Sequence, residues 1–271
     1  MSEIGPLNMA VCIKICPDTA QLRVDPATRA PDLEFAPFRV GTIDENAVEE
    51  AVRLKETYGG RIVAVTLAPK EPPQELIHKV LAMGADEAVV VEDPTASSAD
   101  ALATATVLRA ALSRLGPFDL VLCGEGSLDA YNRQVGPRLA TALGVQLLAQ
   151  VTKVGESDGK LLAHRAFEDR TEVVEITFPA VLTVGQEINE PRFPTVLQIM
   201  SASGKTTTRW RLSDLGFGPE QTTAAFSSVR TVEIFAPPED RRRIEVPGKT
   251  ETEVAGELAR LLFEQGLVKV E

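Results

Sequence analysis

The chain has 271 residues, of which 44% are hydrophobic and 25% charged, so it contains enough material for one full globular core. The formal net charge of −11 argues against a nucleic-acid backbone or an anionic membrane as a partner. No apolar run approaches the roughly 20 residues that span a bilayer, and the amino-terminal residues lack a signal-peptide pattern. We therefore expect a cytoplasmic protein without membrane insertion.

The cysteines and histidines limit the chemistry that side chains can supply. Cys12, Cys16 and Cys123 form no Cys-x-x-Cys pair, and their odd number favours a reducing compartment. Each lies in an apolar, strand-like run, so we expect buried side chains. His78 and His164 lie in separate segments, so neither a zinc site nor a serine–histidine triad is readily assembled. We expect no metal ligands and no catalytic side chain.

In chain order, residues 9–185 alternate apolar strands with segments of helical periodicity. Strands are predicted at residues 9–16, 61–67, 87–91, 119–123, 148–154, 161–168 and 173–184. Helices are predicted at residues 45–57, 75–83 and 98–115, the first with Asp44 as its N-cap and Gly59 at its end. This alternation is typical of a largely parallel sheet covered on both faces. The sequence therefore predicts a doubly wound α/β domain over residues 9–185.

After Gly185 the chain no longer alternates in this way. The remaining predictions are a helix at residues 195–201, a Ser/Gly/Thr stretch at 203–208, a strand at 232–235 and a helix at 251–264. The last helix opens with a capping-box pattern, Thr250 followed by Glu253. Because this region has too little apolar surface for its own core, we expect residues 186–271 to form an extended C-terminal arm. The arm packs back on the sheet or around another chain.

One turn is a candidate ligand site. The predicted strand at residues 119–123 runs into a polar turn with Gly124 and Gly126, and a helix follows. The glycines permit close backbone approach, and a helix start presents unpaired N–H groups to an anion. Open α/β sheets also bind ligands where strand ends meet helices. A plain connection between strand and helix is the alternative.

Several segments, in order and at specific spacing, resemble the beta subunit of electron transfer flavoproteins between about Met9 and Met200. They are Lys14 with Pro17-Asp18, residues 47–56 (AVEEAVRLKE), 81–86 (LAMGAD), 119–122 (DLVL), 178–183 (FPAVLT) and 189–192 (NEPR). The resemblance implies an adenine-nucleotide-binding α/β fold and a heterodimer with an alpha subunit. It also implies a redox FAD shared with that subunit, and an AMP within this chain. Such a carrier passes electrons between flavin dehydrogenases and a quinone-linked or other acceptor, without a catalytic side chain of its own.

The resemblance also implies which residues bind cofactors. For the nucleotide they are Cys12, Gly41, Asp44, Leu67, Gly124, Asp129, Asn132, Gln134, Val135 and Gly136. Asp129, Asn132 and Gln134 would bond ribose or phosphate, and the amides of residues 134–136 would hold the phosphate. Alternatively, Asp129 is a turn residue and Asn132 an N-cap.

Two further roles follow from the resemblance. Arg165 matches an arginine of the flavin-side face, although Ala166 departs from the family pattern, and an ion pair with Glu168 or Asp169 is the alternative. Val196 or Leu197 matches an apolar anchor for the partner dehydrogenase. Burial of both side chains against the sheet is the other interpretation.

Two alternative functions stay open. The pattern at residues 134–137 (QVGP) is closer to flavin-bifurcating relatives, which carry a second FAD in place of AMP, but residues 129–133 match neither group. The other alternative is a stand-alone adenine-nucleotide sensor or hydrolase. Against it, the phosphate-loop pattern around Gly204-Lys205-Thr206 is incomplete, with Ile199 in place of the leading glycine.

Overall fold

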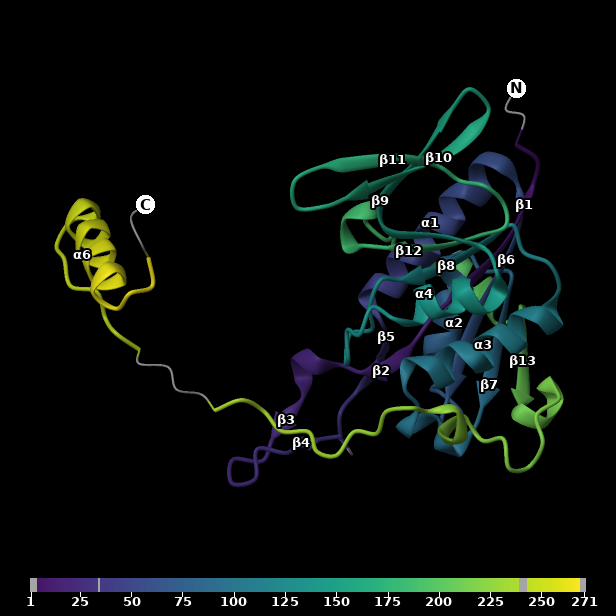
Figure 1. The fold of residues 1–271 in the computed structure, drawn as a ribbon, viewed down its shortest axis with the longest axis horizontal. Coiled ribbons are helices and arrows are strands. Elements are labelled where there is room, and N and C mark those ends of the chain that lie inside the picture. Colours follow the sequence, from purple (N-terminus) through teal and green to yellow (C-terminus); the bar gives the residue numbers. More distant parts are fainter. Residues whose placement is uncertain (1–3, 34, 239–242, 269–271) are drawn as a thin grey trace.

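The computed structural model describes residues 4–33, 35–238 and 243–268. Its central feature is a nine-stranded sheet (Figure 1). The strand order is β11 (Thr171–Glu175), β10 (Lys160–Ala166), β9 (Gln146–Ser157), β12 (Ala180–Val184), β8 (Leu120–Gly124), β1 (Leu7–Cys12), β6 (Gly60–Ala68), β7 (Glu87–Glu92) and β13 (Thr206–Arg211). All neighbours from β9 to β13 are parallel, whereas β10 and β11 extend the sheet as antiparallel strands.

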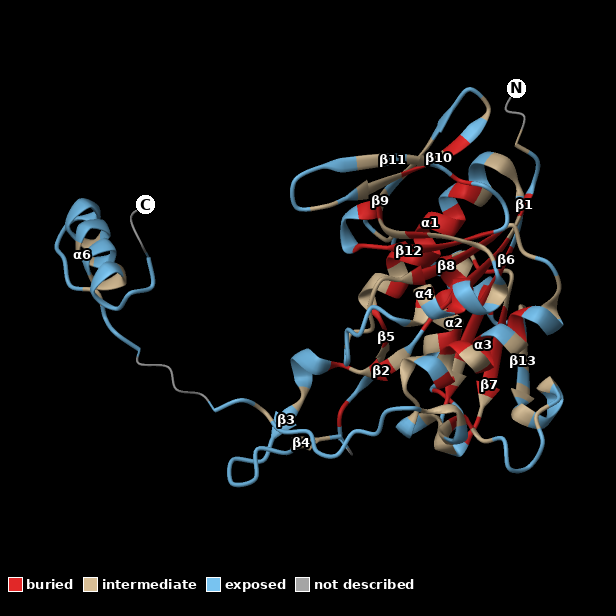
Figure 2. Ribbon diagram, viewed as in Figure 1, coloured by how far each residue is buried: buried red, intermediate tan, exposed pale blue. Residues whose placement is uncertain are grey.

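Helices cover both faces of the sheet. On one face lie α1 (Thr42–Tyr58) and α2 (Gln74–Met83), and on the other α3 (Ala101–Leu115) and α4 (Val135–Leu143). Met9 and Val11 of β1 join the first apolar layer, and Ala10 and Cys12 join the second, as the two-residue period of a strand requires. Buried residues accordingly concentrate in the sheet and its facing helix surfaces (Figure 2). The predicted doubly wound α/β fold is confirmed.

Two predicted helix starts are wrong. α1 begins at Thr42 with Gly41 as its N-cap, so Asp44 lies inside the first turn and does not cap the helix. α3 begins after Asp100, which accepts the N–H of Ala103 at 2.8 Å, while Pro94–Ser98 form a separate 3-10 turn. The predicted end of α1 is correct, since Gly59 has a φ of 78°, which glycine adopts without strain.

Two predicted strands are each divided. β1 ends at Cys12, and β2 (Ile15–Pro17) pairs outside the sheet with β5 (Phe38–Val40). The division follows because Lys14 turns toward α1 through a backbone hydrogen bond to Asp44. β11 and β12 are separated by the Phe178–Pro179 peptide, which is cis, and they lie in different parts of the sheet. Proline lacks the N–H that a continuous central strand needs.

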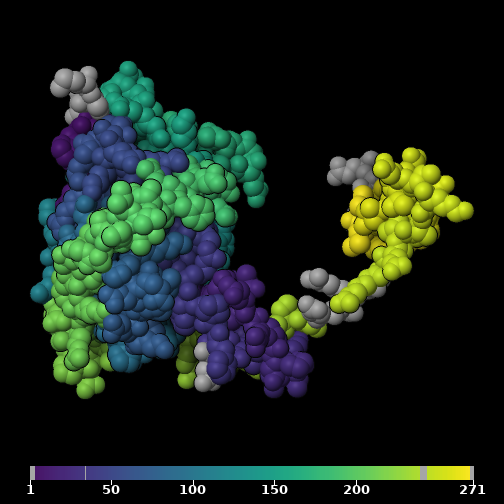
Figure 3. Space-filling view, turned by 180° about the vertical axis from the view of Figure 1, so that it is seen from behind, coloured from purple at the N-terminus to yellow at the C-terminus, as the bar shows by residue number. Residues whose placement is uncertain are grey.

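The region after Gly185 holds one strand that the sequence did not predict. β13, within and beyond the Ser/Gly/Thr stretch, adds a parallel strand beside β7. Before it come the 3-10 turn Gln186–Ile188 and α5 (Val196–Ala202), and after it the 3-10 turns Leu212–Leu215 and Thr223–Phe226. The segment around α5 forms a raised green ridge across the blue surface of α1 and α2 (Figure 3).

The last part of the chain leaves this body. The predicted strand at residues 232–235 is absent from the described structure; the segment is extended instead. It crosses the hairpin of β3 (Arg23–Val24) and β4 (Pro31–Asp32), which follows the 3-10 turn Thr19–Gln21, and Ala236 N–H donates to the Arg29 carbonyl at 2.8 Å. α6 (Glu251–Glu264) is formed as predicted, stands clear of the body in Figure 1, and has no buried residue.

The capping box of α6 is only half made. Thr250 Oγ1 accepts the N–H of Glu253, but Glu253 Oε2 accepts the N–H of Lys249 in place of that of Thr250. Among the described residues, no helix is long and apolar enough to cross a membrane.

Candidate functional site

The candidate site lies where the winding of the sheet reverses. From β1 the chain proceeds through β6 and β7 on one side and then crosses to β8 on the other side of β1. Cys12 and Cys123 pair in register near the carboxyl ends of β1 and β8. In open α/β sheets, ligands bind in the crevice at such a switch point. The turn singled out from the sequence follows β8 and therefore opens at this crevice.

A buried carboxylate connects the elements around the crevice. Asp44, in the first turn of α1, is 6% exposed, and its Oδ2 accepts the backbone N–H of Lys14 at 2.8 Å. The backbone N–H of Gly124 is a second donor. Burial raises the pKa of Asp44 to about 7, and both N–H donors oppose that rise. The Asp44 carboxylate thus joins α1 to the residues that end β8 and follow β1.

Three predicted glycines are required by packing around this crevice. A Cβ on Gly41 would lie 2.7 Å from Asp44 Oδ2, and a Cβ on Gly124 would lie 2.5 Å from Asp44 Oδ1. A Cβ on Gly136, in the first turn of α4, would overlap Cγ2 of Thr183 in β12. A side chain fits at none of these positions. Their contact with a ligand stays a prediction.

Asp129 reaches across the mouth of the crevice to Lys14. The Lys14 Nζ lies 2.6 Å from Asp129 Oδ2, and both side chains are partly exposed. Burial works to raise the pKa of Asp129, but the Lys14 charge and hydrogen bonds outweigh it and hold the pKa below its usual range. Asp129 is therefore an ionised carboxylate beside a lysine, and it is available to exchange partners with a ligand.

The turn between Asp129 and α4 presents free backbone donors. The N-cap of α4 is Gln134, which makes no side-chain capping bond, so the prediction of Asn132 as N-cap is wrong. Gln134 Oε1 instead accepts from Nε and Nη2 of Arg138 at 3.0 and 2.8 Å. Within the described residues, the N–H groups of Asn132, Arg133 and Gln134 have no partner. With Val135, the first residue of α4, they form a concentration of unpaired N–H groups at a helix start.

The other predicted nucleotide contacts line the same edge. Leu67 lies near the carboxyl end of β6, next to β1, and is partly buried. Cys12, Cys16 and Cys123 are buried free thiols, as expected. Burial raises the pKa of Cys16 to about 11, and a hydrogen bond with Cys12 together with burial raises the pKa of Cys123. Cys16 and Cys123 are therefore neutral thiols, and contact of Cys12 with a nucleotide stays a prediction.

Arg165 lies apart from the crevice. Across the sheet, Arg165 of β10 is opposite Val151 of β9, Val151 is opposite Val184 of β12, and Val184 is opposite Gly124 of β8. Three strand spacings, about 14 Å, therefore separate the backbones of Arg165 and Gly124. Arg165 Nε donates to the Ala149 carbonyl at 2.8 Å, and Nη1 lies 3.3 Å from Glu172. The sequence alternative of an ion pair with Glu168 or Asp169 is wrong, because Glu172 of β11 takes that place.

Val196 and Leu197 lie on α5 and are exposed. Their exposed fractions are 73% and 78%, so the interpretation that they are buried against the sheet is wrong. α5 packs on α2 through Ala202, which is buried. The role of a partner anchor stays a prediction.

Lys205 does not form part of a phosphate loop. Its Nζ donates to the carbonyls of Leu81 and Ala85 at 2.8 and 2.7 Å, at the carboxyl end of α2. A lysine that caps a helix end stabilises that end. The Gly204-Lys205-Thr206 segment therefore has a structural explanation.

Sequence reasoning missed a side-chain cluster at the turn. Glu125, Tyr131 and Arg133 contact one another immediately before α4. Tyr131 and Arg133 have φ values of 45° and 56°, in the left-handed region that few side chains adopt. The only signal in the sequence was that residues 129–133 departed from the family pattern.

Comparisons with known proteins show the family to which this fold belongs. The family described as "Electron transfer flavoprotein domain" matches residues 35–215. The caffeyl-CoA reductase-Etf complex subunit CarD of Acetobacterium woodii is 34% identical over 263 residues, which cover 97% of this chain and 100% of the relative. The electron transfer flavoprotein beta subunit of Clostridium acetobutylicum is 37% identical over 209 residues, covering 77% and 80% of the two chains.

A third relative supports the same assignment. The electron transfer flavoprotein beta subunit of Thermoanaerobacterium thermosaccharolyticum is 37% identical over 199 residues, covering 73% of this chain and 76% of its own. The family match at residues 35–215 includes α1, β8 and α4, which border the crevice. The chain therefore belongs to the beta subunit family of electron transfer flavoproteins.

Proposed function

We propose that this electron transfer flavoprotein beta subunit binds an adenine nucleotide in the crevice between β1 and β8. The phosphate lies on the backbone amides of residues 134–136, with Asp129, Asn132 and Gln134 near the ribose or phosphate. The observation that carries this proposal is the turn before α4, whose N–H groups lack partners among the described residues and meet the positive end of a helix. Because the chain carries a net charge of −11, such local donors are needed to hold an anion.

A redox FAD is shared with an alpha subunit in this proposal. When bound, the flavin supplies the acceptance and release of electrons, and the side chains of this chain bind and orient it. Arg165 is the residue of the β9–β10 region assigned to the flavin side. Flavin dehydrogenases donate the electrons, and a quinone-linked or other acceptor receives them, in the cytoplasm.

The partner contacts divide between two parts of the chain. The exposed Val196 and Leu197 of α5 contact the donor dehydrogenase, since an exposed apolar pair fits a central anchor of an interface. The arm with α6 contacts the alpha subunit, because this helix has no buried residue in the described chain and yet exposes Leu258 and Phe263.

A flavin-bifurcating carrier, with a second FAD in place of AMP, is the second candidate. Two observations favour it. One is the QVGP pattern at residues 134–137, and the other is a relative that matches 97% of this chain and whose name places it in a reductase complex. Both candidates use the same crevice, since FAD contains an adenylate group.

The test is the nucleotide content of the heterodimer. The full-length chain is purified together with its alpha subunit, denatured with acid, and the released nucleotides are separated and quantified, with a flavin spectrum taken before denaturation. One FAD and one AMP per heterodimer support the first candidate, and two FAD support the second. A heterodimer that carries one FAD and no further nucleotide contradicts the proposed crevice site.

A further inference from the structure

The segment that matches neither group of relatives, residues 129–133, supplies two of the three residues of a cluster that the proposed function does not use. We define the Tyr131 clamp as Glu125, Tyr131 and Arg133. The Tyr131 hydroxyl donates to Glu125 Oε1, and Arg133 Nη2 donates to the same oxygen at 3.2 Å and to the Tyr131 hydroxyl oxygen at 3.1 Å. The three side chains thus share one hydrogen-bonded centre.

The Tyr131 ring contacts Arg133 and Gly126 of the same turn. The Arg133 guanidinium carbon lies 4.8 Å from the ring centroid, a cation–π distance. A Cβ added to Gly126 would lie 2.7 Å from Cδ2 of the ring. Tyr131 is therefore packed against its own turn.

The clamp fixes an unfavourable backbone conformation. Tyr131 and Arg133 both have positive φ, and a side chain at such a position costs free energy unless its surroundings hold it. Gln134, which follows, is right-handed, with φ −112° and ψ −23°. A left-handed residue followed by a right-handed one directs successive N–H groups into one concavity that binds anions. These are the N–H groups proposed above to hold the phosphate.

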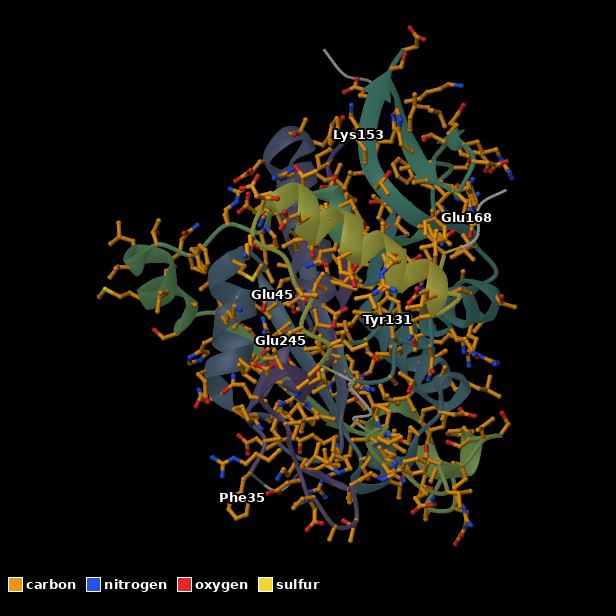
Figure 4. The ribbon with its side chains drawn as sticks, turned by 90° about the vertical axis from the view of Figure 1, so that its left-hand side faces the viewer. Phe35, Glu45, Tyr131, Lys153, Glu168 and Glu245 are labelled. Atoms are coloured by element: carbon orange, nitrogen blue, oxygen red, sulfur yellow. The ribbon has the colours of Figure 1, made fainter. Side chains whose placement is uncertain are left out.

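We infer that Tyr131 and Arg133 are positioning residues that hold the phosphate-binding amides in place, and that they set the affinity for the phosphate of the nucleotide. This inference rests on the proposed function, because it concerns the same crevice. Tyr131, labelled in Figure 4, and Arg133 are half exposed, so the clamp lies at the surface of the turn.

The chain offers a matched control for the Tyr131 clamp. It has two tyrosines, and the other, Tyr58, also donates its hydroxyl to a glutamate, Glu156, at 2.8 Å. Tyr58 lies at the carboxyl end of α1, away from the turn before α4. Tyr131→Ala and Tyr58→Ala therefore each remove a tyrosine–glutamate pair, from a half-exposed tyrosine in the first case and a partly buried one in the second, but only the first touches the turn.

The experiment measures nucleotide binding to the full-length chain by calorimetry. The ligand is AMP or FAD, whichever the unaltered chain binds more tightly, and adenosine is the ligand without phosphate. Tyr131→Ala is expected to weaken nucleotide binding about 10-fold or more, the effect of weakening a hydrogen bond to a charged group. The affinity of Tyr131→Ala for adenosine is expected to stay within 2-fold of that of the unaltered chain. The affinity of Tyr58→Ala for the nucleotide is also expected to stay within 2-fold.

A second substitution separates conformation from simple loss of contacts. Asparagine adopts positive φ more readily than alanine, so Tyr131→Asn is expected to retain more nucleotide affinity than Tyr131→Ala. The inference is overturned if Tyr131→Ala leaves nucleotide affinity unchanged, weakens adenosine to the same extent, or binds as well as Tyr131→Asn. If the unaltered chain binds neither AMP nor FAD, the proposed crevice site is rejected as well, so the two failures are distinct.

Discussion

Arg192 binds the buried carboxylate of Glu49 through two nitrogens, with Nη2 2.9 Å from Oε1 and Nε 3.0 Å from Oε2. The Glu49 side chain is 2% exposed, whereas Arg192 is 38% exposed and also reaches Glu56 at 2.6 Å. Glu49 belongs to α1, and Arg192 precedes α5 by a few residues. The pair therefore fastens the start of the exposed ridge to the core helix of the domain.

Loss of this arginine is expected to destabilise the fold. Arg192→Ala leaves the buried Glu49 carboxylate with only Arg53 as a charged partner. We expect the free energy of unfolding to fall by about 2 kcal/mol. This is less than for a fully buried pair, because Arg192 is partly exposed. Urea denaturation measures the change. The control is Arg260→Ala on α6, where a solvent-exposed arginine also bridges two glutamates and the expected change is within about 0.5 kcal/mol.

Gly136→Ala is expected to disrupt both stability and the site. Its Cβ would overlap Cγ2 of Thr183, and such overpacking costs about 1–3 kcal/mol. Because Gly136 lies in the first turn of α4, the displaced helix start should also lower bound nucleotide, measured after acid release. The second substitution Thr183→Ser removes Cγ2 but keeps the hydroxyl that accepts the Gln150 N–H, so it is expected to restore part of both losses. No rescue in the double variant would contradict this explanation.

Asp44 is expected to make stability depend on pH. Its folded pKa is raised to about 7, above the value of about 3.9 expected when unfolded. Between these values the folded state binds a proton that the unfolded state does not, so this group makes stability fall as pH rises from about 4 to 7. Asp44→Asn is expected to flatten that slope in urea denaturation at several pH values. Glu50, whose pKa is also raised by burial, contributes in the same direction, so Glu50→Gln is the matched comparison.

Substitution on α5 is expected to affect partner recognition and leave stability unchanged. Leu197→Asp places a charge on a side chain that is 78% exposed, so we expect a change in the free energy of unfolding within about 0.5 kcal/mol. We expect kcat/KM for electron transfer from the donor flavin dehydrogenase to fall about 10-fold or more, mainly through KM, as for an interface anchor. Val173→Asp, on β11 and 54% exposed, is the control. Equal kcat/KM for both variants would remove Leu197 from the interface.

The core of the fold could be predicted from the sequence because its signals are local. Apolar runs predict the strands β1, β6, β7 and β8 directly, and a glycine predicts the end of α1. β13 could not be predicted in this way. Its threonines and arginines carry no apolar run, and it becomes a strand only because β7 offers an open edge.

The site was predictable in position and less so in detail. Glycines and a strand-to-helix turn located the crevice, and Gly41, Gly124 and Gly136 all lie around it. The capping role of Asp44 was wrong, since the helix starts two residues before it and its carboxylate instead meets backbone donors from distant segments. The left-handed conformations of Tyr131 and Arg133 depend on contacts within the folded turn, which no residue pattern specifies.

In the part of the chain that the structure describes, the two outer strands of the sheet, β13 and β11, each have one edge that no other strand of the sheet covers. β13 ends in Arg209 and Arg211, and Arg209 is already paired with Glu71 and Glu92. At the opposite border, Glu172 and Glu175 of β11 are paired with Arg165, Arg170 and Lys160. A foreign strand that aligned there would have to displace hydrated, neutralised charges. A long, largely parallel sheet with unclosed borders is thereby protected against edge-to-edge aggregation.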